Sequence, residues 1–282
     1  MANKEKLANK DLPALLTQEN VKKRFTEVLD KNAPNFIQTL LTIYNSNEQF
    51  KKCEPVSILA AAGLAATLNL SISPTLGYAY IIPFGNKAQF QIGVKGLVQL
   101  AHRTGRYTAL HSGVVREGEI RGVDCITGEL IRGEKLSEEI IGYVAFMRLD
   151  NGFEKSLYMT KEEIEKHADT FSQTYRADKA KNWSSSIWSK HFDRMACKTV
   201  LKLLLNRWGV MSAGLQEAIQ GDQSVVTKST FTYVDNDGHT SAREDYSQLE
   251  FQTPCGEPAT ENIEQTPCGE IVNPVTGEVV GF

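Results

Sequence analysis

The sequence predicts an α+β fold in which a small mixed sheet, built from hairpins, is flanked by helices. Two observations carry this prediction. Strand-like segments separated by short turns lie together in the middle of the chain, whereas helical periodicity dominates before and after them. Because strands and helices do not alternate, a sheet of parallel βαβ units is not expected. At 282 residues the chain can bury a substantial core.

Helices are expected in the amino-terminal part. Apolar residues recur at helical spacing over residues 18–45, and the pair Ala33-Pro34 divides them into two amphipathic helices. Pro55 stands where a helix favours its first residue, and the Ala- and Leu-rich run that follows to Leu70 predicts a buried helix. The two amphipathic helices leave two interpretations open, because an apolar face can join neighbouring subunits or pack within its own chain.

A stretch without charged residues, 55–86, is long enough to cross a membrane. Asn69, Pro74 and Gly77 interrupt it, so a buried helix followed by a turn and a strand is the better interpretation. The charged amino terminus lacks the apolar core of a signal peptide, and the five cysteines contain no CxxC pair. We therefore expect a cytoplasmic protein with free thiols and no membrane contact.

Strands are predicted in the middle of the chain, beginning with a hairpin. Two apolar runs, residues 78–84 and 88–93, are joined through Gly85-Asn86-Lys87, which indicates a tight turn. An amphipathic helix is expected next, at residues 94–103, and Gly105 is placed to end it.

Further strand-like segments follow at residues 107–116, 140–149 and 154–159, with an Asp-Asn-Gly turn between the last two. Thr160 and Glu163 have the spacing of a capping box, so a short helix is expected to begin there. These segments supply the small sheet of the predicted fold.

The longest predicted helix covers residues 183–206, and a shorter one covers residues 212–219. Basic residues recur on the long helix at i,i+4 spacing and continue just beyond it: Lys190, Arg194, Lys198, Lys202 and Arg207. Between Lys181 and Arg207 the sole acidic residue is Asp193, so the row lacks the opposite charges that usually support a surface helix. Four helical residues advance about 6 Å, which is comparable with the phosphate spacing of an extended strand. The row is therefore predicted to follow a nucleic-acid backbone.

A second basic wall is expected opposite this helix. Arg103 and Arg106 lie at the end of the 94–103 helix, and Lys87 and Lys95 precede them. Two cationic walls form a groove, and single-strand binding without sequence preference needs little else. Taken singly, each of these residues is more often a solvated surface charge.

Aromatic residues accompany the basic row, at Trp183, Trp188 and Phe192. For each of them two interpretations are open, because an aromatic ring can stack on a base or pack in the core, which is its more frequent place. Trp188 and Phe192 join the cations as candidate DNA-binding residues.

The charge of the chain changes near Gly221. Residues 1–220 hold 29 Lys and Arg against 23 Asp and Glu, whereas residues 221–282 hold 2 against 11. A basic body with an acidic tail hints at nucleic-acid binding, because a polyanion is drawn to the body. The sequence Thr-Pro-Cys-Gly-Glu occurs twice in the tail, which is typical of turns or disorder. We expect a core at 1–220 and a largely disordered tail at 221–282, which is either a solvated linker or a docking or regulatory segment.

Signatures of catalysis are absent from the sequence. No G-x-x-x-x-G-K-[ST] phosphate loop occurs, which argues against chemistry driven by ATP, and the five histidines form no H-E-x-x-H or Cys-His set. The sequence therefore predicts no catalytic residue, no metal and no cofactor. Two alternatives stay open. One is a metal-dependent nuclease whose carboxylates converge only in the fold, and the other is a scaffolding protein whose basic face binds acidic protein.

Several runs of sequence, in this order, carry a family resemblance: LGYAYIIPFGNK at residues 76–87, QIGVKGL at 91–97, LAHRTG at 100–105, VVREGE at 114–119 and MACKTV at 195–200. With these runs the chain resembles the RecT family of phage and prophage single-strand annealing proteins, over about residues 55–219. The ordered set is far more specific than any single run.

The resemblance implies a non-enzymatic protein that binds single-stranded DNA and anneals complementary strands without ATP during homologous recombination. It also implies a homo-oligomer on DNA, as a ring or helical filament, contact with the annealed duplex, a companion 5'-to-3' exonuclease and a host single-strand binding protein. Annealing needs no covalent chemistry, because base stacking returns about 1.4 kcal/mol per step once strands pair. The cations are expected to hold the first strand by its phosphates, and residues 1–220 to supply DNA binding, annealing and oligomerisation.

Overall fold

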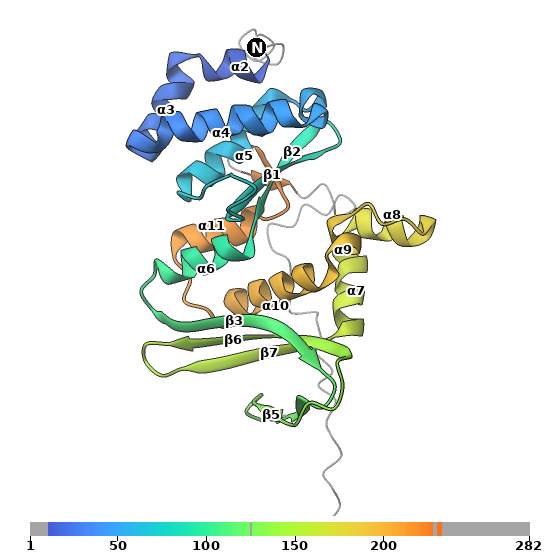
Figure 1. The fold of residues 1–282 in the computed structure, drawn as a ribbon. Coiled ribbons are helices and arrows are strands. Elements are labelled where there is room, and N and C mark those ends of the chain that lie inside the picture. Colours follow the sequence, from blue (N-terminus) through green and yellow to red (C-terminus); the bar gives the residue numbers. More distant parts are fainter. Residues whose placement is uncertain (1–10, 125, 228–229, 233–282) are drawn as a thin grey trace, which may run out of the picture.

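The structure is a computed structural model that describes residues 11–124, 126–227 and 230–232. Helices from the first part of the chain form one end of the molecule, and a three-stranded antiparallel sheet lies toward the other (Figure 1). A long helix from the last third of the chain lies between them. The α+β prediction, with small hairpin sheets flanked by helices, is confirmed.

Short helices make up the amino-terminal end: α2 (Leu12–Leu16), α3 (Glu19–Leu29), α4 (Ala33–Ser46) and α5 (Pro55–Thr67), with 3-10 turns at Asp30–Asn32 and Glu48–Lys52. The predicted division into two amphipathic helices is confirmed, and Pro34 stands in the first turn of α4. The rings of Phe25 and Phe36 lie 5.7 Å apart between α3 and α4, so these apolar faces pack within the chain. Helix α2 was not predicted.

The hairpin consists of β1 (Ala79–Phe84) and β2 (Lys87–Ile92), paired antiparallel, and α6 (Val94–His102) follows it. The turn is made by Gly85, at φ +58°, and Asn86, which agrees with the prediction. Gly105, at φ +70°, follows α6 in the left-handed conformation expected of a residue that ends a helix.

A three-stranded sheet forms from β3 (Tyr107–Arg116), β6 (Ile140–Leu149) and β7 (Glu154–Thr160), in the order β3-β6-β7. All three strands were predicted, whereas the small hairpin of β4 (Ile120–Val123) and β5 (Leu130–Arg132) was not. Helix α7 (Lys161–Phe171) begins with both hydrogen bonds of the predicted capping box between Thr160 and Glu163.

The predicted helix at residues 183–206 is wrong in its first part. After α8 (Gln173–Lys181), a loop leads to the short helix α9 (Ile187–Lys190), and the long helix α10 (Phe192–Trp208) starts only after a break at His191. Serines favour helix caps and turns over helix interiors, and the side chain of Ser186 accepts the Ser189 N–H at 3.1 Å to cap α9. His191 has φ −140° and ψ 51°, outside the helical range.

The end of the described chain returns to the hairpin. Helix α11 (Ala213–Gly221), close to the predicted 212–219, leads into β8 (Val225–Thr227), which pairs with β9 (Thr230–Thr232). The backbone N–H of Phe90 in β2 donates to the Ser224 carbonyl at 3.1 Å, and the Gln223 N–H donates to the Phe90 carbonyl at 2.9 Å. Residues just beyond 220 thus pack on the body, while the remainder of the predicted acidic tail lies outside the described residues.

None of the helices in the described ranges combines the length and the apolar character that crossing a membrane requires. Cys53 and Cys197 are free thiols, as predicted, and the other three cysteines lie outside the described residues.

Candidate nucleic-acid interface

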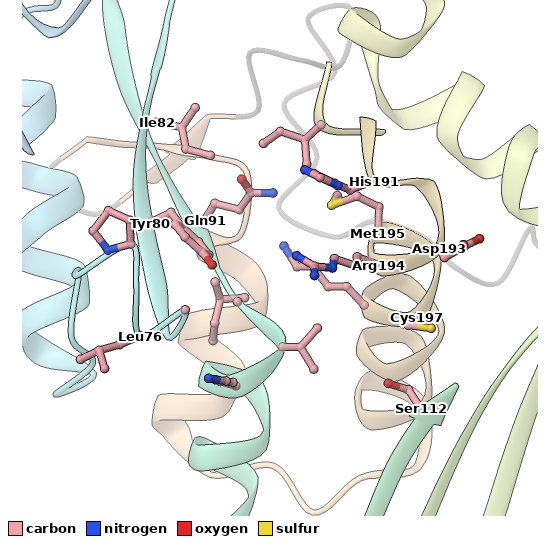
Figure 2. A pocket seen from close by; sticks show the side chains of 18 of the residues that line it. Leu76, Tyr80, Ile82, Gln91, Ser112, His191, Asp193, Arg194, Met195 and Cys197 are labelled. Carbon is pink, nitrogen blue, oxygen red and sulfur yellow. The ribbon is translucent and has the colours of Figure 1, made fainter. Parts of the chain in front are cut away.

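A cleft of about 930 Å³ lies between the β1–β2 hairpin and the helices α9 and α10 (Figure 2). Tyr80 and Ile82 of β1 and Gln91 of β2 line one wall, and Ile187 and Met195 line the other. These walls come from parts of the chain separated by about a hundred residues, so the cleft exists only in the folded protein. Its lining mixes apolar side chains with a few polar and cationic ones, which suits a ligand that is both charged and aromatic.

Glycines shape the hairpin wall. A Cβ atom on Gly93 would lie 2.1 Å from the carbonyl oxygen of Gly77, and one on Gly96 would lie 2.2 Å from that of Tyr78. Only glycine therefore allows α6 to begin so close to the loop that enters β1. The Gly93 N–H also donates to the Tyr78 carbonyl at 2.8 Å. This packing fixes the first turn of α6, where Lys95 lines the cleft and is exposed.

The helical wall supplies further cations. Figure 2 shows Arg194 and Met195 directed from α10 into the cleft, with His191 at the helix break beside them. Lys190 directly precedes His191, and both Lys190 and Arg194 are exposed. With Lys95 on the hairpin side, exposed cations therefore stand on both sides of the cleft.

Asp193 and Cys197 also line the cleft, and each is constrained by its surroundings. The Asp193 carboxylate, turned to the far side of α10 in Figure 2, accepts a hydrogen bond from the Tyr143 hydroxyl at 2.6 Å. Burial, together with this hydrogen bond, raises the pKa of Tyr143 far above its ordinary value, so the hydroxyl stays a donor. Burial likewise raises the pKa of the Cys197 thiol to about 11, which keeps it neutral near pH 7.

The prediction of an uncompensated, exposed row of cations is wrong for Lys198 and Lys202. Both side chains are buried, and their Nζ atoms lie 2.9 Å and 3.5 Å from the carboxylate oxygens of Asp222. Asp222 is itself buried and also accepts the backbone N–H of Ile92 at 3.1 Å. The physical reason is the position of α10, which lies between the three-stranded sheet and the helices α6 and α11, so side chains on both of these sides are covered. Lys198 and Lys202 stabilise the cleft wall and do not extend into solvent.

Trp188 and Phe192 pack in the core, which is the second of the two interpretations that the sequence left open. Trp188 is only 5% exposed, and its ring centroid lies 5.6 Å from that of Phe192. Tyr175 packs on both rings, and Tyr143 lies 6.1 Å from Phe192. These aromatics hold α8, α9 and α10 against the sheet and are not available for stacking on bases.

Arg103 and Arg106 do not form the second basic wall that the sequence predicted, and on the hairpin side of the cleft the lining cation is Lys95. The Arg103 guanidinium donates to the carbonyls of Leu68 and Asn69 at 2.6 Å and 2.8 Å, where it satisfies the end of α5. Arg106 pairs with Asp150 at 2.9 Å. Both arginines have structural roles outside the cleft, because neither lines it.

Two other predicted cations also lie outside the cleft lining. Lys87 is half-buried at the start of β2, and Arg207 is exposed at the end of α10 with its guanidinium carbon 4.6 Å from the ring centroid of Trp208. The sequence reasoning missed Tyr80 and Gln91, although one signal was present. Polar side chains at alternate positions of the apolar strand β2 mark a face that is not ordinary core.

Titratable residues behind the cleft are held neutral or paired. His167 is buried beside the Lys202 ammonium. Burial is the larger cause and the lysine charge the smaller one, and together they lower the pKa of His167 to about 3.

Within the part of the chain that the structure describes, no group of three or more His, Cys, Asp or Glu side chains is arranged to hold a metal ion.

The fold and the cleft together define an α+β protein with a groove that carries exposed cations on both sides. The model of the RecT family matches residues 34–235, and the chain therefore belongs to the RecT family. The match includes α4 except for its first residue, and also the returning segment β8–β9, neither of which the resemblance noted from the sequence covered. Family membership supports a DNA-binding role in recombination and strand annealing.

Two relatives show the range of similarity. The chain is 43% identical to "Uncharacterized protein YqaK" of Bacillus subtilis (strain 168) over 210 residues, which is 74% of this chain and 70% of the relative. It is 27% identical to "Protein RecT" of Escherichia coli (strain K12) over 228 residues, which is 76% of this chain and 81% of the relative.

Proposed function

We propose that the protein binds single-stranded DNA in the cleft between the β1–β2 hairpin and α9–α10, and anneals it to a complementary strand without ATP. The observation that carries the proposal is the placing of two exposed cations, Lys95 and Arg194, on opposite sides of a cleft with an otherwise largely apolar lining. A third exposed cation, Lys190, directly precedes the lining residue His191. A single strand offers phosphates for such cations and flat bases for apolar side chains.

In this proposal the protein lowers the repulsion between two phosphate backbones and performs no covalent step. Lys95 on one side, and Lys190 and Arg194 on the other, hold the first strand by its phosphates and keep it extended. Bases that are kept from folding back into hairpins then meet their complement, and stacking of the new duplex, about 1.4 kcal/mol per step, supplies the driving force. ATP is not required because the product is more stable than the separated strands.

The proposal extends to partners that the RecT resemblance implies. Copies of the chain assemble along the strand as a ring or filament, and a 5'-to-3' exonuclease supplies the single strands. A host single-strand binding protein delivers them, in the cytoplasm. The amphipathic helices α3 and α4 use part of their apolar surface within the chain, so an assembly through them would use the remainder, such as Val28, which is 45% exposed.

The experiment is a stopped-flow annealing assay with complementary oligonucleotides, full-length protein and no nucleotide. The protein should accelerate pairing at low salt. If three cations each neutralise one phosphate, the logarithm of the affinity for a single strand should fall with the logarithm of salt concentration at a slope of about −2. Failure to accelerate pairing at low ionic strength would refute the proposal.

The same samples separate the alternatives. Shortened oligonucleotides after incubation with Mg²⁺ or Mn²⁺ would indicate a nuclease. Equal affinity for heparin and DNA, without faster pairing, would indicate a protein whose basic face serves as a scaffold.

A further inference from the structure

Trp183 is presented to solvent in the loop between α8 and α9. Its side chain is 63% exposed, more than any other aromatic side chain in the ranges that the structure describes, where the next is Phe153 at 41%. An exposed indole loses the hydrophobic stabilisation that burial would give it, about 25 cal/mol per Å² of apolar surface. Trp188, five residues further on, is by contrast 5% exposed and part of the core.

The loop that carries Trp183 is held by hydrogen bonds. The buried carboxylate of Asp178 accepts the backbone N–H groups of Ser185 and Ser186 at 2.8 Å and 2.6 Å, and the hydroxyls of Ser185 and Ser189 at 2.5 Å and 2.8 Å. The Ser185 hydroxyl, followed by the Ser186 N–H, lowers the pKa of Asp178 far below its ordinary value, so the carboxylate stays charged. The exposure of the ring is thus part of an ordered arrangement.

The backbone at Trp183 is fixed as well. Its N–H donates to the Asp178 carbonyl at 2.8 Å, and Asn182 before it takes the left-handed conformation, φ +54°, that ends α8. The ring therefore projects from a preorganised turn, and a ligand that uses it would not have to order the loop first.

A cation lies beside the ring, and the chain that follows the ring leads to the cleft. The Lys181 ammonium lies 4.8 Å from the indole centroid. Ile187, four residues after Trp183, is 44% exposed and lines the cleft, and the exposed Lys190 closes the same helix. An aromatic plane beside a cation, four residues along the chain from the cleft lining, complements a nucleotide, which combines a flat base with a phosphate.

We propose that Trp183 stacks on an unpaired base of the single strand where the strand leaves the cleft past α9, and that Lys181 neutralises a neighbouring phosphate. This inference rests on the proposed function and assigns a base-contacting residue outside the cleft lining. Stacking on an indole does not distinguish bases, so the contact holds any sequence in register without selecting among sequences. The site follows from an exposed ring on an ordered loop, whereas Trp188 and Phe192 are ordered but packed in the core.

The test compares full-length protein and Trp183 variants in binding two probes by fluorescence anisotropy: an oligo-dT long enough to extend beyond the cleft, and a matched oligonucleotide with abasic sites throughout. Trp183→Ala should bind oligo-dT about tenfold more weakly, whereas Trp183→Phe keeps most of the affinity. On the abasic probe all three proteins should agree, because no base is present to stack. Phe153→Ala removes an exposed aromatic ring from the β6–β7 turn, away from α8 in Figure 1, and should bind both probes like the unchanged protein.

A spectroscopic measurement gives an independent signature. The chain has tryptophans at 183, 188 and 208. Stacking on a base quenches indole emission, so oligo-dT should quench the unchanged protein and Trp208→Phe, while Trp183→Phe should lose the quenching.

The outcomes are distinguishable. If the unchanged protein fails to bind oligo-dT, the proposed function itself is refuted. If it binds and anneals, but Trp183→Ala has the same affinity and the quenching persists in Trp183→Phe, the stacking site is refuted. An equal loss on both probes, or a changed oligomeric state of DNA-free Trp183→Ala in light scattering, would mean that the ring serves folding or contact between copies, and would also overturn the inference.

Discussion

Replacing Asp222 with Asn removes a buried charge and keeps the size of the side chain. The carboxylate is 1% exposed, lies 2.9 Å and 3.5 Å from the Nζ atoms of Lys198 and Lys202, and accepts the Ile92 N–H at 3.1 Å. Neutralising one partner of a buried ion pair costs about 3–5 kcal/mol. In a domain of this size, each kcal/mol changes Tm by about 2–4 °C. Asp222→Asn is therefore expected to lower Tm by about 10 °C.

The matched control is Asp150→Asn. Asp150 also pairs with a cation at 2.9 Å, the Arg106 guanidinium, but the two side chains are 43% and 48% exposed. A pair in that position contributes about 0–1 kcal/mol, so the control should melt within about 3 °C of the unchanged protein. Thermal unfolding followed by circular dichroism, in one buffer at pH 7, measures both variants. If the two variants melted together, the burial argument for Asp222 would be refuted.

The same substitution has a functional readout. Asp222 contacts the hairpin wall through Ile92 and the helical wall through Lys198, so its loss should let the walls separate. The affinity for a single-stranded oligonucleotide, measured well below Tm, should fall in Asp222→Asn and stay unchanged in Asp150→Asn. Equal affinities in both variants would show that the spacing of the walls does not depend on this carboxylate.

Three further predictions follow from the structure. Arg194→Ala should weaken single-strand binding and make the salt dependence shallower by about 0.7, whereas Lys161→Ala, exposed on α7 outside the cleft lining, should leave the slope unchanged. Gly93→Ala places a Cβ atom 2.1 Å from a backbone oxygen and should lower both Tm and the free energy of unfolding. Gly63→Ala adds a Cβ atom in open space at a helical position of α5, so it should leave the free energy of unfolding unchanged or raise it by up to about 1 kcal/mol. The pKa of His167 is lowered in the folded state, so protonation favours the unfolded chain. The free energy of unfolding should therefore fall as pH drops from about 6.5 toward 3, and that of His167→Phe should depend less on pH over the same range.

Local signals in the sequence were sufficient for most of the fold. Pro55 at the start of α5, the Gly85-Asn86 turn and the capping box at Thr160 each act through neighbouring residues, and each prediction is confirmed. The β4–β5 hairpin was not predicted, because its strands are short and its segment is mostly polar. The helix break at His191 was not predicted, because apolar residues continue at helical spacing on both sides of it.

The site was only partly predictable, because the burial of a charged side chain depends on distant partners. Lys198 and Arg194 look alike in the sequence, one helical turn apart. One is buried and the other exposed, because α11 and the turn after it bring Asp222 to Lys198, 24 residues away in the chain. Nothing in the spacing of the cations reveals such a partner. For the same reason, the sequence could not show that Trp183 rather than Trp188 remains at the surface.

The contact between Asp222 and the Ile92 amide spans 130 positions of the chain. Synthesis proceeds from the amino terminus, so the hairpin emerges from the ribosome long before the carboxylate that ties it to α10. Contacts of such separation close late in folding, since the loop between them must first be ordered. We therefore expect a nascent chain to lack a finished groove until nearly all of the body has been translated, which would delay capture of nucleic acid until the protein is almost complete.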